Sequence, residues 1–436
     1  FFEYYGEEKD PNLVAEQNVP TPNQATPREF VDISRFVRRD LDIPLITAVC
    51  LTTLIGIIMI YSASYNWDLG TAGQIYEKQI TWAVLALIAL AITVAIPLKF
   101  FYAFAYILYG LSVTLLLLVL ELGARRWFNL GPVHIQPSEL AKLAMVLVLA
   151  RYLSVRNRDF TRARTFVQPF LLVLVPTLLV FKQPDLGTAL VFSSVILPLF
   201  FWAGVRTVHL FFMISPGLTL ICAFHPWTLA PMVLLLVGLL FFHRPRLLTT
   251  IVLLLINLTV AVGAPYLWDN KLHDYQKRRI MTFLNPDMDR LGAGYQVIQS
   301  KVAIGSGGIR GKGYLEGTQT KLAFLPEQHT DFIFSVVGEE FGFAGAMLIL
   351  GLFIFIIWRA FKIAIQVKSR FASLVAIGLT VILVFHVFVN IGMTIGVMPV
   401  TGLPLPFLSY GGSTLVMSMV LIGFLLNINA NRHETF

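Results

Sequence analysis

Charged side chains are scarce in this sequence, and this scarcity excludes an ordinary soluble domain. Asp, Glu, Lys and Arg make up 13% of the 436 residues, whereas about a quarter of the residues are charged in a typical soluble domain. The mean hydropathy is +0.74, and long apolar runs recur along the chain. Most of the chain is therefore predicted to lie in a lipid bilayer.

Cysteine is also nearly absent. Cys50 and Cys222 both lie inside apolar runs, which predicts buried small side chains and no disulfide framework. His329 stands among carboxylates, but the HExxH-type spacing typical of a zinc site is missing. The stretch GSGGIRGKG at 305–313 fails the phosphate-binding P-loop pattern, because Gly313 follows Lys312 where Ser or Thr is required. It predicts a tightly folded glycine-rich loop, with a backbone anion nest as an alternative.

Twelve apolar segments separate the polar parts of the chain. Eighteen helical residues cover about 27 Å, enough to cross a hydrocarbon core, so the sequence predicts an all-α polytopic membrane protein with about 10–12 transmembrane helices and a transmembrane domain over 41–430. Residues 1–40 lack apolar periodicity and are predicted to form a mobile tail, and 431–436 form a short C-terminal tail. The predicted spans are 43–62, 80–98, 100–122, 138–154, 165–182, 185–205, 207–225, 227–243, 247–268, 332–358, 373–395 and 411–428.

Positive charge orients these spans. Arg and Lys precede the first span and follow the second, fourth, sixth, eighth, tenth and twelfth. Such clusters mark cytoplasmic loops, so both termini are predicted to be cytoplasmic. The net charge of +8 is then a topology signal and no indication of nucleic-acid binding. The loops 123–137, 269–331 and 396–410 share the opposite, extracytoplasmic side.

The segment 269–331 is the only long polar stretch between apolar spans. It ends abruptly at Asp331, directly before the apolar Phe332-Ile333-Phe334. Two interpretations fit a carboxylate at this boundary, namely an N-cap of the next helix and a catalytic base. The preceding loop is basic, with Lys277, Arg278, Arg279, Lys301, Arg310, Lys312 and Lys321, which suits an anionic substrate beside that base.

Charged residues near the start of two other spans are further candidates. Glu139 and Lys142 stand three residues apart, so they share one helix face near the membrane surface. Charges at that depth usually line a cavity, although a helix cap with a local ion pair is the alternative. Asp185 is placed to cap the next span, to contact a ligand in a cavity, or to do both.

Polar and helix-breaking residues also occur deeper in the chain. Glu339, Glu340 and Asn390 lie within predicted spans and are candidates because intramembrane polar groups are usually functional. The segment 399–412, PVTGLPLPFLSYGG, has too much Pro and Gly for a helix. At membrane depth such backbone must be buried in protein or line a cavity.

Several long strings, in this order, resemble the SEDS family, and within it the RodA branch more than FtsW or SpoVE. They are QPSELAK, PDLGT, GAGYQVIQSKVAIGSGGIRGKG, GTQ, FLPEQHTDFIFSVVGEE, VNIGM and PLPFLSYGGS. The resemblance covers roughly 40–430. It implies a multi-pass peptidoglycan glycosyltransferase of the bacterial cytoplasmic membrane that polymerises lipid II on the extracytoplasmic face during cell elongation. Partners implied are a class B penicillin-binding protein, which crosslinks the strands, and the elongation machinery.

The same resemblance assigns roles to residues. The family's essential loop aspartate falls on Asp331, its cavity Glu and Lys on Glu139 and Lys142, and its PDLGT aspartate on Asp185. Further candidates for substrate contact are His134, Arg126, Lys301, His329, Glu340, Asn390 and Ser409. The metal is unknown, and no cofactor is certain, with a divalent cation such as Mg²⁺ or Mn²⁺ as the open alternative.

Two features depart from the family pattern. The family often has Arg two residues before the Gln of QPSE, where this chain has His134, so Arg125 or Arg126 is expected to substitute in phosphate contact. The family usually has ten spans, and 207–243 is predicted to add a helical hairpin. Two competing functions remain open at this stage, a lipid II flippase and a non-catalytic scaffold for the penicillin-binding protein.

Overall fold

The computed structural model describes residues 41–66, 71–72, 74–122, 126–130, 133–155, 164–244, 246–271, 277, 281–283, 293–321 and 327–434. The predicted tail at 1–40 and parts of the predicted loop at 269–331 lie outside this set. The description below concerns the compact unit 40–436.

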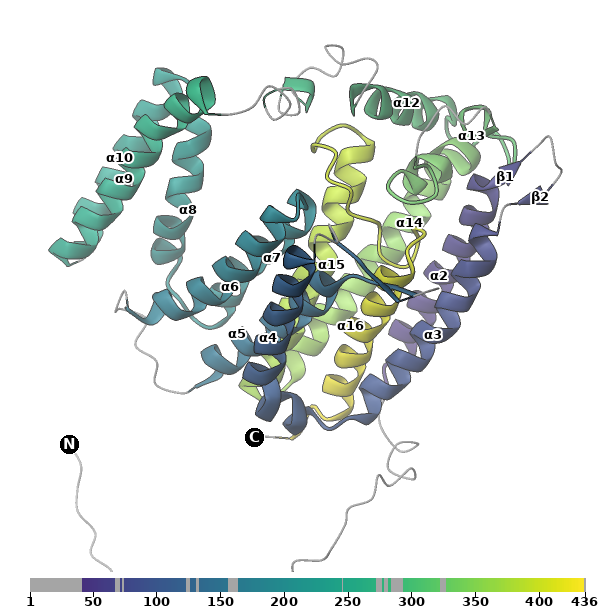
Figure 1. Cartoon of the computed structure of the whole chain (residues 1–436), viewed down its shortest axis with the longest axis horizontal. Coiled ribbons are helices and arrows are strands. Elements are labelled where there is room, and N and C mark those ends of the chain that lie inside the picture. The colour runs from purple at the N-terminus through teal and green to yellow at the C-terminus, as the bar shows by residue number, and fades with distance from the viewer. Residues whose placement is uncertain are drawn as a thin grey trace, which may run out of the picture. The chain divides into compact units, whose positions relative to one another are not determined.

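Helices dominate the described residues, which confirms the predicted all-α polytopic membrane fold (Figure 1). They are α2 (Ile43–Ala63), α3 (Ile75–Ala95), α4 (Leu98–Glu121), α5 (Pro137–Ser154), α6 (Arg164–Lys182), α7 (Leu186–Trp202), α8 (Thr207–Cys222), α9 (Pro226–His243), α10 (Leu247–Asn270), α12 (Ala293–Ser306), α13 (Thr318–Lys321), α14 (Ile333–Gln366), α15 (Arg370–Thr394) and α16 (Gly412–Ala430). Two antiparallel hairpins, unforeseen from the sequence, pair β1 (Tyr65–Asn66) with β2 (Thr71–Ala72) and β3 (Phe128–Leu130) with β4 (Val133–Ile135).

A helix corresponds to each of the twelve predicted spans. Among the described helices, nine are long and apolar enough to cross a membrane, and α7 and α8 are shorter apolar helices. The charged residues of helix α5 are Glu139, Lys142 and Arg151. Two boundaries differ from the predicted ones by five residues or more, since α3 begins at Ile75 and α14 continues to Gln366. Hydropathy marks only the apolar part of a helix, whereas backbone hydrogen bonding continues through its polar turns.

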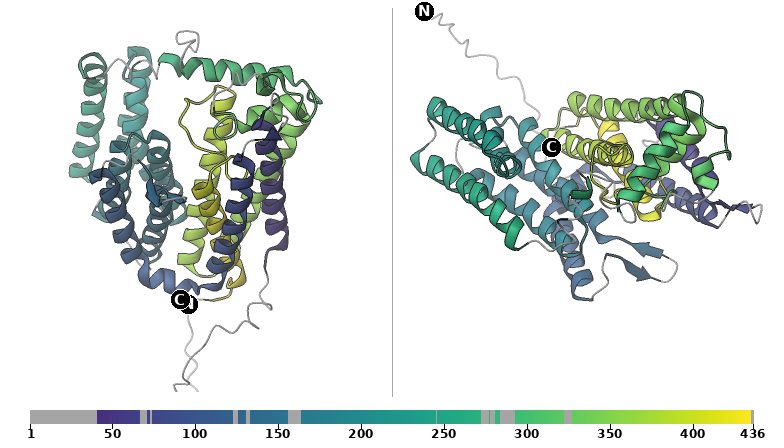
Figure 2. Two further views of the ribbon diagram at one scale, coloured as in Figure 1. Left: turned by 45° about the vertical axis from the view of Figure 1, so that its right-hand side comes forward. Right: turned by 90° about the horizontal axis from the view of Figure 1, so that it is seen from above.

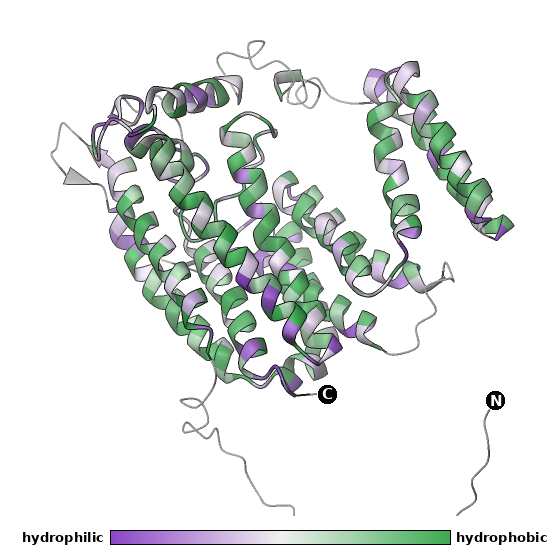
Figure 3. Cartoon of the chain, turned by 180° about the vertical axis from the view of Figure 1, so that it is seen from behind, coloured by the Kyte–Doolittle hydropathy of each residue, from purple (hydrophilic) through white to green (hydrophobic). Residues whose placement is uncertain are grey.

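The interior of the bundle is built on α5, α15 and α16, whose side chains are mostly buried. Helix α15 packs against α5, α7 and α14, and α16 packs along α3. The outer helices expose many Leu, Ile, Val and Phe side chains, and Figure 3 colours most of their length as hydrophobic. Large exposed apolar faces on so many helices are expected where lipid is the solvent.

Helices α8, α9 and α10 form a group of their own, in which α8 packs against both of the others. A small apolar core contains Phe212, Leu236 and Leu240. Polar side chains join α8 to α10, because Asn257 accepts a hydrogen bond from Thr219 at 2.7 Å and donates one to Ser215 at 3.0 Å. The predicted hairpin at 207–243 corresponds to α8 and α9, and this polar contact ties the hairpin to α10.

Helix α14 is broken at Gly342, where the backbone is non-helical with φ 63° and ψ −158°. The glycine-rich turn after α12 supplies the hydrogen bonds that the break removes. The amides of Lys312 and Gly313 donate to the carbonyls of Glu339 and Glu340, each at 3.0 Å, and the Phe343 amide donates to Gly308 at 2.8 Å. The prediction of a tightly folded glycine-rich loop is confirmed, and its amides hydrogen-bond to a helix.

The two ends of the bundle differ in character. Helices α12 and α13 lie at the end opposite the C-terminus (Figures 1 and 2). At the C-terminal end, Arg359 of α14 forms an ion pair with Asp42 at 2.6 Å, and Asp42 also accepts from the Leu45 amide at 3.1 Å as the cap of α2. Polar loop elements and basic helix ends thus separate as predicted, while the assignment of the C-terminal end to the cytoplasm stays a prediction.

The close approach of the glycine-rich turn predicts a large effect of Gly311→Ala. Gly311 has φ +79°, and a Cβ there would lie 2.0 Å from the carbonyl oxygen of Glu340. We expect Gly311→Ala to lower the free energy of unfolding by about 2 kcal/mol or more, measured as thermal unfolding in detergent. Gly351→Ala in α14 is the matched control, since nothing lies within 4 Å of its added methyl group. Equal melting temperatures for the two variants would contradict the close packing of Gly311 against α14.

Candidate functional site

A non-helical segment, residues 399–411, runs between α15 and α16 and is largely buried. Its backbone groups find partners on neighbouring helices. Asn390 donates to the carbonyl of Leu403 at 2.8 Å, and His386 Nδ1 lies 3.3 Å from the carbonyl of Pro404. Gln79 donates to the carbonyl of Ser409 and accepts from the Gly411 amide, both at 3.3 Å. The structure therefore meets the expectation that irregular backbone at membrane depth is buried in protein.

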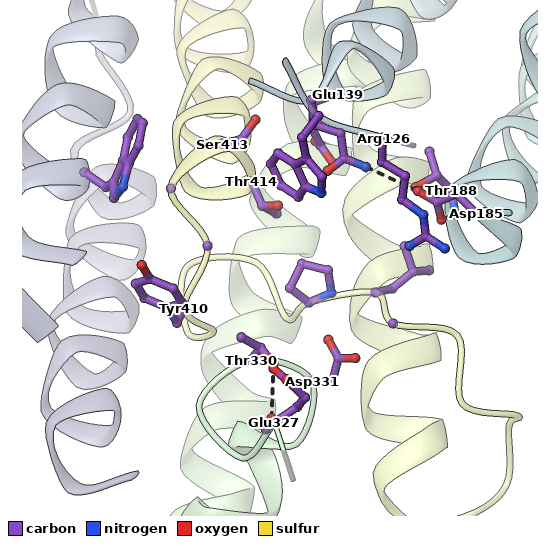
Figure 4. A pocket seen from close by; sticks show the side chains of 18 residues that line it. Arg126, Glu139, Asp185, Thr188, Glu327, Thr330, Asp331, Tyr410, Ser413 and Thr414 are labelled. Atoms are coloured by element: carbon purple, nitrogen blue, oxygen red, sulfur yellow. Dashed lines mark hydrogen bonds between the residues drawn. The ribbon is translucent and has the colours of Figure 1, made fainter. Parts of the chain in front are cut away.

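This segment forms one wall of a cavity of about 810 Å³. Most of the other walls come from the region before β3, the starts of α5 and α7, and the turn before α14. Figure 4 shows the labelled side chains, with Asp331, Thr330 and Glu327 on one side and Glu139, Asp185 and Arg126 on another. The lining residues are Trp82, Arg126, Trp127, Gln136, Glu139, Asp185, Thr188, Glu327, Thr330, Asp331, Gly402, Leu403, Pro404, Tyr410, Gly411, Gly412, Ser413 and Thr414.

Asp331 lies in the turn just before α14 and faces the cavity. It is not the N-cap of that helix, because Phe332 occupies the cap position and makes no side-chain cap hydrogen bond. The Asp331 backbone is held by Asn390, whose amide nitrogen donates to the Asp331 carbonyl at 3.0 Å. Within the described part of the chain, no hydrogen bond reaches the Asp331 carboxylate. A fixed backbone with an unengaged carboxylate is the arrangement that a general base requires.

The environment of Asp331 changes its acidity. The pKa of Asp331 is raised from 3.8 to about 6, chiefly by burial and also by the Glu327 carboxylate, while Arg126 acts in the opposite direction. Glu327 has φ +54° and accepts a hydrogen bond from the Thr330 hydroxyl at 3.0 Å. Because this pKa lies just below neutrality, the Asp331 carboxylate is ionised at neutral pH and is a stronger base than an exposed aspartate.

Glu139 lines the cavity from the first turn of α5, with Lys142 one turn further along. The predicted shared face is confirmed by an ion pair of 2.9 Å between Lys142 Nζ and Glu139 Oε1. Lys142 does not line the large cavity. It borders a second cavity of about 10 Å³ behind Glu139, where its ammonium lies 3.1 Å from His386 Nε2.

Asp185 serves as a cap and also faces the cavity, so both predicted roles apply to its position. Its carboxylate accepts from the Thr188 amide at 3.1 Å, which caps α7, and from Gln136 Nε2 at 3.2 Å. Arg126 donates to the carbonyls of Gln183, at 3.3 Å, and Pro184 in the turn before α7. These contacts hold a guanidinium and a carboxylate next to each other at the cavity wall.

Of the remaining predicted substrate contacts, Ser409, His329, Glu340 and Lys301 are not among the residues that line the cavity. Ser409 Oγ accepts from the Leu405 amide at 2.9 Å and so stabilises its own segment. The His329 ring lies 5.7 Å from the Tyr410 ring. Glu340 is buried and accepts from Ser62, and Lys301 lies on α12 close to Gly396. His134 belongs to β4, but its side chain is outside the described set.

Several cavity residues were not foreseen from the sequence. Glu327 stands four residues before Asp331, and this spacing of two carboxylates in one polar turn is a signal that could have identified it. Trp82, Trp127 and Tyr410 add aromatic surface. His386 carries no sequence signal beyond being a polar residue in an apolar span. Among the described residues, no group of three or more His, Cys, Asp or Glu side chains is arranged to hold a metal ion.

Comparison with known proteins gives consistent matches over nearly the whole described region. The family model FTSW_RODA_SPOVE, described as a cell cycle protein, matches residues 43–230 and 227–434. The peptidoglycan glycosyltransferase MrdB of Escherichia coli K12 is 39% identical over 385 residues, covering 86% of this chain and 91% of the relative. The peptidoglycan glycosyltransferase RodA of Treponema pallidum is 35% identical over 428 residues, covering 90% and 98%.

Two solved structures also match over nearly the whole chain. The rod shape determining protein RodA of Thermus thermophilus matches with a TM-score of 0.60 and 28% identity, covering 91% of this chain and 98% of that one. A chain from a structure described as "Structural coordination of polymerization and crosslinking by a peptidoglycan synthase complex" matches with a TM-score of 0.67 and 34% identity, covering 91% and 99%.

The raised pKa of Asp331 predicts a gain in stability for Asp331→Asn. Because folding raises this pKa from 3.8 to about 6, the folded state disfavours the charged form. The free energy of unfolding therefore falls as the pH rises from about 4 through about 6 and stays low above that. We expect Asp331→Asn to raise the free energy of unfolding at pH 8 by about 2 to 3 kcal/mol.

Thermal unfolding in detergent at pH 8 and pH 4.5 measures this difference. The gain should shrink at the lower pH, where Asp331 is largely protonated in the folded state. Glu316→Gln, at an exposed carboxylate outside the cavity, is the control and should change the melting temperature little at either pH. A loss of stability in Asp331→Asn at pH 8 would contradict the prediction.

Proposed function

Because the chain belongs to the SEDS family of FtsW, RodA and SpoVE proteins, we propose that it polymerises lipid II into glycan strands during cell elongation, with Asp331 as the general base. Its full-length relatives carry the name peptidoglycan glycosyltransferase, and this chain is a peptidoglycan glycosyltransferase of the multi-pass membrane type. The observation that carries the assignment of the site is the 810 Å³ cavity, which gathers Asp331, Glu139, Asp185 and Arg126 from separate parts of the chain.

The proposed reaction is a single displacement. The 4-hydroxyl oxygen of the acceptor sugar forms a bond to the anomeric carbon of a lipid-diphosphate sugar, and the bond from that carbon to the diphosphate oxygen breaks. Asp331 takes the hydroxyl proton, and the lipid diphosphate leaves with the bonding electron pair. One displacement inverts the configuration at the anomeric carbon. A carboxylate with a raised pKa suits this proton transfer at neutral pH.

Charge on the departing diphosphate needs a cation in the cavity. Arg126 lines the cavity, whereas Lys142 lies behind Glu139. We therefore assign direct diphosphate contact to Arg126, and Lys142 acts by offsetting the charge of Glu139. For a divalent cation such as Mg²⁺ or Mn²⁺, Glu327 is the carboxylate that would hold it together with substrate phosphates, and the ion would supply further charge neutralisation while Asp331 stays free to take the proton.

A class B penicillin-binding protein is the proposed partner. The support is the structural match to a chain of a peptidoglycan synthase complex that polymerises and crosslinks. The proposed location is the bacterial cytoplasmic membrane, with the cavity opening to the extracytoplasmic side and both termini in the cytoplasm. Polymerisation outside the cell leaves strands where a crosslinking partner can reach them.

Removal of the proposed base should abolish polymer formation. The purified protein, with its penicillin-binding protein, is incubated with labelled lipid II, and glycan products are separated by gel electrophoresis. We expect Asp331→Asn to lower the rate about 10² to 10⁴-fold, while Glu316→Gln stays within about twofold because its carboxylate is exposed and outside the cavity. Both variants should insert into membranes and unfold cooperatively.

Other outcomes of this assay separate the competing functions. Undiminished glycan synthesis by Asp331→Asn would remove Asp331 from the mechanism. Movement of labelled lipid II across vesicles with no polymer from the unmodified protein would favour a flippase. Polymer formed only by the penicillin-binding protein, whichever variant accompanies it, would favour a scaffold.

The pH dependence of polymerisation follows from the same carboxylate. Only ionised Asp331 accepts a proton, so the rate should rise with pH and reach half its maximum near pH 6. Glu327 raises the pKa of Asp331, so Glu327→Gln should move the midpoint to lower pH. Rate measurements between pH 4.5 and 8 in both proteins test this. A midpoint that is unchanged or higher in Glu327→Gln would contradict the assignment of Asp331 as the titrating base.

A further inference from the structure

A buried polar cluster behind the main cavity joins α5, α15 and the segment 399–411. Lys142 Nζ lies 2.9 Å from Glu139 Oε1 and 3.1 Å from His386 Nε2. His386 Nδ1 lies 3.3 Å from the carbonyl oxygen of Pro404. The side chains of Glu139, Lys142 and His386 are all buried, and the adjoining cavity of about 10 Å³ has room for about one water molecule.

The protonation of His386 follows from its two neighbours. A lysine ammonium donates hydrogen bonds and accepts none, and a backbone carbonyl only accepts. His386 Nε2 therefore carries the lone pair that accepts from Lys142, and Nδ1 carries the proton that it donates to Pro404. The ring is neutral and holds a different element with each nitrogen, so its tautomer is determined by both contacts.

The contact with Pro404 extends this cluster to the wall that faces Asp331. Gly402, Leu403 and Pro404 line the main cavity, and a Cβ on Gly402 would lie 3.6 Å from Asp331 Oδ2. One turn after His386, Asn390 donates to both the Leu403 carbonyl and the Asp331 carbonyl. Helix α15 therefore holds the same stretch of backbone at two consecutive carbonyls.

We infer that His386 is a positioning residue, which holds the Lys142 ammonium behind Glu139 and ties this pair to the cavity wall opposite Asp331. This inference rests on the proposed glycosyltransferase function. Glu139 lines both cavities, whereas Lys142 and His386 line only the smaller one. With Nε2 of His386 present, the lysine offsets the charge of Glu139 from behind and stays out of the space that the substrate occupies. His386 touches no substrate and acts through Lys142.

Two amide substitutions separate the two contacts of the ring. In His386→Asn the amide lies near the place of Nδ1, so it can still donate to Pro404 but does not reach Lys142. In His386→Gln the amide lies near the place of Nε2, where its oxygen can accept from Lys142. We expect His386→Asn to lower kcat for lipid II polymerisation about 10- to 100-fold with little change in KM, and His386→Gln to recover most of that loss.

An independent measurement reports how accessible the Lys142 side chain is to a reagent. Membrane protein in detergent is treated with acetic anhydride, and acetylation of Lys142 is quantified by mass spectrometry. Without an acceptor at residue 386 the Lys142 side chain is free to turn toward the large cavity, so its labelling should rise severalfold in His386→Asn and stay low in His386→Gln. Thr380→Val is the matched control on α15, because within the described residues this buried hydroxyl bonds only to the Ala376 carbonyl, at 2.7 Å, and not to Lys142.

The outcomes are distinct. Equal kcat and equal labelling for the Asn and Gln variants would overturn the inference. A loss of rate that merely follows a fall in melting temperature, with Lys142 labelling unchanged, would also overturn it, since His386 would then have only a structural role. If the unmodified protein forms no polymer, the proposed function fails, and the labelling difference between the two variants still decides whether His386 positions Lys142.

Discussion

This structure depends on one constraint. Backbone that lies inside the membrane bundle but is not helical must still form hydrogen bonds. The segment 399–411 satisfies only part of its backbone itself, with a turn in which the Leu408 and Ser409 amides donate to the Leu405 carbonyl, so side chains on other helices supply further partners. Asn390 is central because its one amide nitrogen donates to the carbonyls of both Leu403 and Asp331. This contact joins the cavity wall to the turn before α14. The position of the Asp331 carboxylate is thus a consequence of how buried backbone is satisfied.

The same constraint explains the glycine-rich stretch, which fails the P-loop pattern and was predicted to fold tightly. Helix α14 breaks at Gly342, and amides and carbonyls of 308–313 replace its lost hydrogen bonds. Such close approach leaves no space for side chains, as the Cβ positions at Gly307 and Gly311 show, each 2.0 Å from a carbonyl oxygen of α14. Glu339 completes the contact, since its carboxylate accepts from Lys312 at 2.7 Å and from the Gln319 amide at 2.9 Å. Glycine serves packing here, and the neighbouring carboxylate anchors the loop.

Charges inside the bundle fall into two kinds. Lys142 and Glu139 form an ion pair of 2.9 Å, which offsets the large desolvation penalty of isolated charges. Asp331 has a fixed backbone and, within the described residues, a carboxylate without a hydrogen-bond donor. Burial and Glu327 outweigh Arg126 and raise the pKa of Asp331 to about 6, which costs stability at neutral pH. Catalytic groups are often the least stabilised part of a fold, because a satisfied carboxylate would be a weaker base.

Local pattern alone predicted much of this protein. Apolar length located twelve helices, the boundary between loop and span singled out Asp331, and the spacing of three residues correctly paired Glu139 with Lys142. The local pattern did not predict contacts between segments that lie far apart in the sequence. Only the folded chain places Arg126 in the large cavity and Lys142 behind Glu139, breaks α14 at Gly342, and brings His386 against Lys142, 244 positions apart in sequence. Helix formation depends on neighbours three or four residues away, which the sequence displays, whereas a side chain's partner across a bundle depends on the packing of all the helices together.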